Sequence, residues 1–185
     1  MDAMTRLAEA DAAARLADRD PTLFSADVEM RPRIIHRLGW TDLAERAVLR
    51  LPLIDNLAAE MAGEKITDLV LLGMGGSSLA PLVIDRVLEP AEGAPRLHVL
   101  DTTAPSATER LLGTLTPPTT AFILASKSGT TIEPLALYAV FRAWMDDELG
   151  RVAAGRRFIV ITDPGSPLVR RRQKDVMRVA IAAPA

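Results

Sequence analysis

The chain has 185 residues, enough for one domain of ordinary size with an extension. Hydrophobic residues make up 49% and aromatic residues only 4%, which predicts a core built from aliphatic side chains. With 22 Lys and Arg against 24 Asp and Glu, the formal charge of −2 argues against a nucleic acid or an anionic membrane as partner, and the lack of cysteine excludes disulfides, thiolate metal sites and thiol catalysis.

The N-terminal residues 1–20 are rich in alanine and carry charges of both signs, without the apolar centre of a signal peptide. No window of the sequence offers the roughly eighteen uninterrupted apolar residues that a membrane span requires. We therefore expect a soluble, cytoplasmic protein.

Residues 1–62 favour helices and irregular chain, and we expect them to form an N-terminal helical arm. Residues 4–19 predict one amphipathic helix that ends before Pro21. A second helical segment spans residues 40–61, where Pro52 predicts either one kinked helix or two short ones.

From residue 63 onward, short apolar runs alternate with helical patterns. The strands expected from these runs cover residues 68–72, 96–101, 120–126, 157–162 and 176–182. The helices expected between them cover residues 78–88, 106–112, 131–149 and 166–174, the last with Ser166 as N-cap. This alternation predicts an α/β domain over residues 63–185 with a doubly wound, five-stranded parallel sheet.

The first strand is followed by a glycine-rich turn, Gly73-Met74-Gly75-Gly76-Ser77-Ser78. Glycines allow a tight turn and a close approach of a ligand to the backbone. Taken alone, the turn could be a degenerate dinucleotide-binding motif, with Asp101 as the acid that binds the ribose. Ser78 argues against that oxidoreductase interpretation, because the motif has Gly or Ala there for close helix packing.

The third strand is followed by Ser126-Lys127-Ser128-Gly129-Thr130-Thr131, which combines four hydroxyls, a lysine and a glycine at the start of a helix. Backbone N–H groups at a helix N-terminus bind anions. Thr130 and Glu133 also fit a capping box, but a cap needs only one hydroxyl. The turn therefore predicts an anion site.

In a sheet with the flavodoxin-like order 2-1-3-4-5, the first and third strands are neighbours at the switch point where such sheets bind ligands. The turns 73–78 and 126–131 would then face one crevice. A phosphate dianion needs several hydrogen-bond donors, so we interpret the pair as a site for a phosphomonoester.

The segments 73–81 (GMGGSSLAP) and 126–133 (SKSGTTIE) together resemble the first sugar-isomerase (SIS) domain of the glucose-6-phosphate isomerase family. Residues 18–24 and 37–40 are similar to bacterial members, including the isomerase half of transaldolase–isomerase fusions. The resemblance extends over roughly residues 15–168. It implies a phosphosugar-binding domain whose ligand is a hexose phosphate.

The resemblance also implies roles for individual residues in substrate binding. The sugar phosphate would be held by Ser126, Ser128 and Thr131, with Thr130 nearby. Gly76 and Ser77 would line the sugar, and Lys127 would lie at the edge of the pocket.

The family interconverts glucose 6-phosphate and fructose 6-phosphate through an enediolate, without a metal or a cofactor. A carboxylate base, an arginine, a histidine and a lysine carry out this reaction, and the resemblance places them after a Gly-Gly-Arg segment that follows a strand like residues 176–182. No catalytic residue can be assigned in the chain, so we expect a truncated isomerase that binds hexose phosphate weakly and isomerises it poorly or not at all. A non-catalytic phosphosugar sensor is the alternative, and either would form a homo-oligomer or pair with a second SIS domain.

The remaining polar candidates have structural interpretations. We expect His98 to be a packed strand residue and His36 to be structural. Glu133 is expected to cap its own helix, Asp163 to begin a turn, and residues 170–174 to form a solvated basic face.

Overall fold

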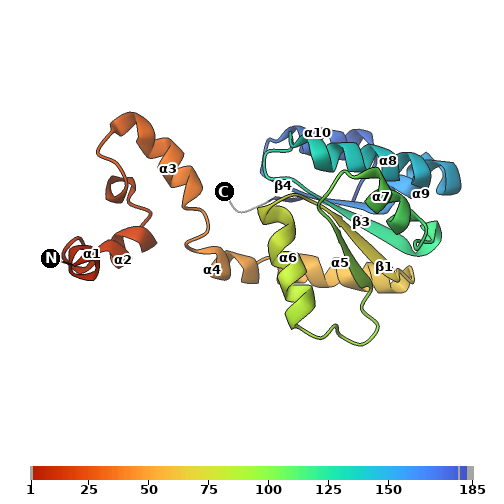
Figure 1. The fold of residues 1–185 in the computed structure, drawn as a ribbon, viewed down its shortest axis with the longest axis horizontal. Helices are drawn as coiled ribbons and strands as arrows, with labels where there is room; N and C mark the ends of the chain where they lie inside the picture. The colour runs from red at the N-terminus through yellow and green to blue at the C-terminus, as the bar shows by residue number, and fades with distance from the viewer. Residues whose placement is uncertain (1, 179, 183–185) are drawn as a thin grey trace. The chain divides into compact units, whose positions relative to one another are not determined.

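Figure 1 shows the computed structural model of the chain, which describes residues 2–178 and 180–182. These residues group into two compact units, one reaching Asp55 and the other beginning at Asn56. The division falls inside helix α5 (Leu51–Gly63). The boundary between residues 62 and 63 that we expected from the sequence stays a prediction.

The first unit consists of short helices and 3-10 turns. They are α1 (Ala3–Glu9), α2 (Ala12–Ala17), η1 (Pro21–Leu23), η2 (Val28–Met30), α3 (Arg31–Arg37) and α4 (Leu43–Val48). The single helix expected over residues 4–19 is wrong, because the chain breaks at Asp11, whose φ of 47° is left-handed. The second helical segment is divided into α4 and α5, and Pro52 lies in the first turn of α5, where its missing N–H is tolerated.

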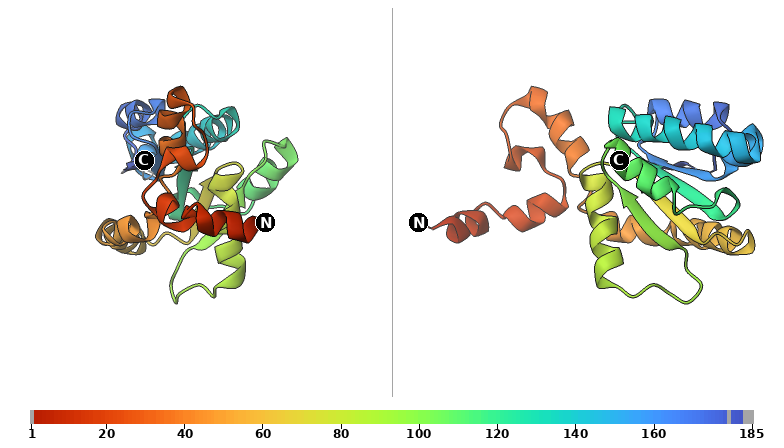
Figure 2. Two further views of the ribbon diagram at one scale, coloured as in Figure 1. Left: turned by 90° about the vertical axis from the view of Figure 1, so that its left-hand side faces the viewer. Right: turned by 45° about the vertical axis from the view of Figure 1, so that its right-hand side comes forward.

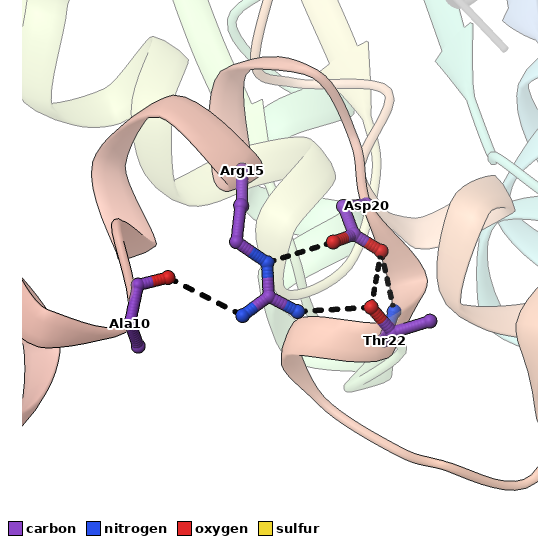
Figure 3. A network of polar contacts seen from close by, with 4 residues as sticks. All are labelled: Ala10, Arg15, Asp20 and Thr22. Carbon is purple, nitrogen blue, oxygen red and sulfur yellow. Dashed lines mark hydrogen bonds and ion pairs between the residues drawn. The ribbon is translucent and has the colours of Figure 1, made fainter.

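A polar network joins α2 to η1 (Figure 3). The Arg15 guanidinium donates to the Asp20 carboxylate at 2.7 Å, to the Thr22 hydroxyl at 2.9 Å and to the Ala10 carbonyl at 3.3 Å. Hydrogen bonds from Thr22, reinforced by Arg15, lower the pKa of Asp20 to about 2. This network fixes the turn between the helices in a unit where, among its described residues, only Leu38 and Gly39 are buried.

The second unit contains a parallel sheet in the order β2-β1-β3-β4-β5, which confirms the expected topology. Four strands of five or six residues form its body: β1 (Asp68–Leu72), β2 (Arg96–Leu100), β3 (Thr120–Ala125) and β4 (Phe158–Thr162). A short strand, β5 (Ala180–Ala182), completes one edge. The start that we predicted for this strand, at residue 176, is too early, because Val176 has a φ of 58° and lies in a turn. Residue 179 of the predicted strand lies outside the described residues.

Helices cover both faces of the sheet (Figures 1 and 2). Helix α6 (Gly76–Val87) lies on the same face as α5, and α7 (Pro105–Leu112), α8 (Ile132–Leu149), α9 (Arg151–Arg156) and α10 (Pro167–Lys174) lie on the other. A 3-10 turn, η3 (Pro117–Thr119), precedes β3. Helix α9 was not expected from the sequence. Within the described residues, no helix is both long and apolar enough to cross a membrane.

The core on the α8 face has an aromatic centre, so the expectation of a purely aliphatic core is wrong. Phe122, Phe141 and Phe158 are fully buried, with the rings of Phe122 and Phe158 stacked at 4.7 Å and Phe141 5.1 Å from Phe122. Few aromatic residues are present, but they are concentrated at the point where β3, β4 and α8 meet. Aliphatic side chains such as Val70 and Leu124 surround them.

Ion pairs attach the end of α5 and the residue that follows it to other segments of the second unit. Glu64 pairs with Arg157 at 2.6 Å and also with Arg178, which is 3.2 Å from Glu60. Both arginine side chains are largely buried, whereas the two glutamates remain accessible to water. These contacts explain why residues after Asp55 group with the sheet.

Candidate functional site

The two turns identified in the sequence begin at the same edge of the sheet. Strands β1 and β3 are parallel neighbours, with Leu72 in register with Leu124. Gly73 directly follows Leu72, and Ser126 comes two residues after Leu124. The turns 73–78 and 126–131 therefore leave adjacent strands at their carboxyl ends, as expected for this strand order.

The turn after β1 is shaped by its glycines. Gly75 has a φ of 56° and is the N-cap of α6, while a Cβ on Gly73 would lie 3.2 Å from that of Ser77. The buried Ser78 hydroxyl donates to the Gly75 carbonyl at 3.0 Å. Ser78 is thus committed to the turn itself, whereas Gly75 and Gly76 are exposed and Ser77 is half-buried.

The turn after β3 contains two hydroxyl pairs. In the inner pair, the buried Ser126 hydroxyl donates to the Thr131 hydroxyl at 3.1 Å and accepts the Gly129 N–H at 3.2 Å. In the outer, exposed pair, the Ser128 and Thr130 hydroxyls lie 2.9 Å apart. The inner pair holds the turn, and the outer pair presents hydroxyls to solvent.

The same turn packs tightly against the turn between β4 and α10. Gly129 has a φ of 69°, and a Cβ there would lie 2.9 Å from the Ser166 hydroxyl oxygen. Ser166 in turn shares a 2.7 Å hydrogen bond with the buried Thr162 hydroxyl. The Asp163 N–H donates to the Lys127 carbonyl at 3.0 Å, so the Lys127 backbone is fixed while its side chain is exposed.

Sequence reasoning did not recognise Thr162 and Ser166 as supports of this turn. Ser166 was expected only as a helix cap, and it is the N-cap of α10, but it makes no side-chain cap hydrogen bond. The position of Ser166 could have indicated this role, because the end of β4 lies beside the end of β3 in this strand order.

The N-terminus of α8 lacks a side-chain cap. Its N-cap is Thr131, and no side chain accepts a hydrogen bond from the first turn. The capping box expected from Thr130 and Glu133 is wrong, because the Thr130 hydroxyl pairs with Ser128 instead. The first-turn N–H groups of this 18-residue helix, where the helix dipole favours negative charge, are thus open to an anion.

The two histidines belong to other elements, His98 to β2 and His36 to α3. His98 Nε2 is 2.8 Å from an Asp68 carboxylate oxygen, with both side chains mostly buried, so the expected packed strand residue is confirmed. Burial opposes ionisation of Asp68, but hydrogen bonds from His98 and Thr67 and the nearby positive charge outweigh it and lower its pKa. His36 is exposed on α3, in the first unit.

The remaining polar candidates have few fixed partners. Glu133 is exposed in the first turn of α8. Asp163 begins a turn in which its carbonyl accepts the Ser166 N–H at 3.2 Å. The basic segment 170–174 is mostly exposed, as expected of a solvated face.

The chain is similar to glucose-6-phosphate isomerases from several bacteria. It is 37% identical over 101 residues to the glucose-6-phosphate isomerase of Bartonella bacilliformis, a match that covers 55% of this chain and 18% of that protein. It is 39% identical over 132 residues to the glucose-6-phosphate isomerase of Thermus thermophilus, covering 69% of this chain and 29% of the relative. The chain therefore spans less than a third of the length of these relatives.

The fold has a close counterpart among solved structures. The crystal structure of a hypothetical protein from Thermus thermophilus superimposes with a TM-score of 0.68 at 30% identity, covering 98% of this chain and 40% of that one. Residues 56–167 match the model of the family described as phosphoglucose isomerase, and these residues include both turns. The chain belongs to the phosphoglucose isomerase family.

Proposed function

We propose that the sheet edge formed by the turns 73–78 and 126–131 binds a hexose 6-phosphate. The phosphate would be bound by the hydroxyl-rich turn and the N-terminus of α8, and the sugar would lie against the glycine-rich turn. The residues proposed to contact the ligand are Gly76, Ser77, Ser126, Lys127, Ser128, Thr130 and Thr131.

The observation that carries this proposal is the set of donors around the start of α8. The exposed Ser128–Thr130 pair, the helix N-terminus without a side-chain cap and the Lys127 ammonium offer neutral and cationic donors on one turn. Charge-assisted hydrogen bonds contribute roughly 1.5–3 kcal/mol each, and association costs at least about 4 kcal/mol, so a phosphate dianion needs several such donors together, as this turn provides.

We propose that this chain contributes substrate binding to the isomerisation of glucose 6-phosphate and fructose 6-phosphate. The reaction needs a base that reaches a carbon-bound proton and a donor that meets the developing oxyanion. The two turns supply hydroxyls, backbone N–H groups and one lysine, which are suited to anchoring the substrate. We therefore propose that this chain binds the sugar phosphate and turns it over slowly or not at all.

Calorimetric titration of the chain with glucose 6-phosphate, 6-phosphogluconate and glucose tests the proposal. Both phosphorylated ligands should bind, and glucose should not. Replacing the outer hydroxyl pair in the double variant Ser128→Ala/Thr130→Val should weaken binding about tenfold or more, which corresponds to about 1.4 kcal/mol.

The matched control is Ser106→Ala, which removes an exposed hydroxyl from α7 and should leave the affinity unchanged. Equal affinity of the double variant and the unmodified chain would refute the assigned phosphate site. Stabilisation by NAD in a thermal-shift assay, without stabilisation by 6-phosphogluconate, would favour a dinucleotide site instead.

A further inference from the structure

A second site lies at the β2 edge of the sheet, outside the residues assigned to sugar phosphate. A groove of about 490 Å³ separates β2 from α7. Val99, Leu100 and Leu111 form part of its apolar lining, and Arg96 and Arg110 form part of its polar lining. On the strand side, the lining of the groove runs almost continuously from Arg96 to Thr102, just beyond β2, so the groove follows the strand.

Strand β2 presents an open backbone edge. It is the first strand in the sheet order and pairs only with β1 among the described strands. The Arg96 N–H donates to the Thr67 carbonyl at 2.8 Å, on the β1 side. Because successive peptide groups point to opposite edges of a strand, those of Leu97 and Val99 face outward, where another strand could pair with them.

The charges of the groove are separated along its length. Arg96 lies at the start of β2 and Asp101 just after its end, roughly 17 Å away for an extended chain. Helix α7 returns along the sheet, so Arg110, in its last turn, lies toward the same end as Arg96. Both arginines are exposed and have no acidic partner within salt-bridge distance among the described residues.

We propose that this groove binds an extended peptide of about five residues that ends in acidic residues and pairs antiparallel to β2. The length follows from the separation of the charges, and a small ligand could not reach both ends. Antiparallel pairing brings the acidic C-terminus to Arg96 and Arg110, while apolar side chains lie against Leu111. Addition of a strand at a sheet edge, with a helix as the other wall, is an established mode of peptide recognition.

Fluorescence anisotropy of the full chain with a labelled peptide, Val-Thr-Val-Glu-Glu with a free C-terminus, tests this proposal. The peptide should bind, and its counterpart ending in Lys-Lys should bind at least tenfold more weakly. The double variant Arg96→Glu/Arg110→Glu should lose about tenfold in affinity for the acidic peptide, since exposed charge pairs contribute modestly one by one. The matched control Arg86→Glu/Arg156→Glu changes the net charge equally at exposed positions outside the groove and should retain the affinity.

Two isomeric peptides distinguish strand pairing from simple charge attraction. Each is N-methylated on one of the two alternate sets of residues, which removes the donors on one edge of the peptide. Strand pairing predicts that one isomer binds at least tenfold more weakly and the other binds as the parent does. Equal affinities of the two isomers, displacement of the peptide by excess inorganic phosphate, or full affinity in the Arg96→Glu/Arg110→Glu variant would overturn the proposal, whatever the outcome of the sugar phosphate titrations.

Discussion

Gly129 and Ser166 lie so close that any side chain on the glycine would strike the serine: a Cβ built at Gly129 is 2.9 Å from the Ser166 hydroxyl oxygen. The contact joins the turn after β3 to the turn after β4. The turn 126–131 is consequently shaped by Ser166, which is not among the residues proposed to contact the ligand.

Gly129→Ala should therefore both destabilise the protein and weaken sugar phosphate binding. A φ of 69° disfavours a side chain, and the Cβ would also approach the Leu168 backbone nitrogen to 3.2 Å. We expect a loss of about 2–4 kcal/mol in the free energy of unfolding, measured by urea denaturation. Gly165→Ala is the matched control, because Gly165 has a φ of 77° but open space around it, and its loss should be near 1 kcal/mol. Equal losses in the two variants would mean that the contact with Ser166 is not important.

Gly155→Ala should destabilise the protein although Gly155 lies in helix α9, where alanine is normally the better residue. The new Cβ would overlap the Asp175 carbonyl oxygen and lie 3.2 Å from the Arg142 guanidinium. We expect a loss of at least about 2 kcal/mol on thermal unfolding monitored by circular dichroism. Gly63→Ala, at the end of α5 with nothing within 4 Å, should be neutral or slightly stabilising. A stabilised Gly155→Ala variant would contradict the packing described here.

Arg142→Met should unfold at a lower denaturant concentration, because Arg142 is a buried junction of three segments. Its guanidinium donates to the Asp146 carboxylate at 2.6 Å, to the Asp175 carbonyl at 2.8 Å and to the Arg151 carbonyl at 2.6 Å. Methionine keeps much of the volume but leaves these acceptors without their donor, for an expected loss of about 3 kcal/mol. The exposed Arg156→Met change should stay within about 0.5 kcal/mol, and a similar effect of the two variants would exclude the proposed junction.

Stability should depend on the Asp68 carboxylate in a defined pH range. The folded protein lowers the pKa of Asp68 below 3.8, so ionised Asp68 stabilises the fold above that pH, and this contribution is lost as the pH falls through the lowered value. The difference in unfolding free energy between the unmodified chain and Asp68→Asn should be constant near neutrality and shrink below about pH 4. Urea titrations at several pH values measure it, with Asp85→Asn on exposed α6 as the control. A difference that does not vary with pH would argue against the His98–Asp68 interaction.

The strands of the sheet body and the turns that follow them could be predicted because the relevant signals are local. A strand that is buried on both faces reads as a continuous apolar run, as in residues 68–72, and the glycines after it mark its end. The fixed hand of the crossover connections places the strand-to-helix turns at one edge of the sheet, whereas the order 2-1-3-4-5 was taken from the flavodoxin-like type of doubly wound sheet. The early start predicted for the fifth strand and the unbroken helix predicted over residues 4–19 were wrong, because single residues, Val176 and Asp11, adopt left-handed φ angles that composition does not indicate.

The positions of the hydroxyl groups could be predicted from the sequence, but their hydrogen bonds could not. The hydroxyls of residues 126–131 were recognisable, yet their pairing depends on the φ of Gly129 and on its contact with Ser166, which is 37 positions further along the chain. The predicted capping box is absent for a similar reason, because the Thr130 hydroxyl makes its hydrogen bond with the Ser128 hydroxyl and not with the first turn of α8.

The Ser128–Thr130 pair also has a kinetic consequence. Because the inner pair and the contact with Ser166 hold the turn, the Ser128 and Thr130 hydroxyls can reorient toward a ligand by rotation about two C–O bonds while the backbone stays in place. Hydroxyl rotations are complete within nanoseconds, far faster than loop closure. If this turn binds phosphate as proposed, capture would need no rearrangement of the backbone, and its rate would be set by diffusion and charge.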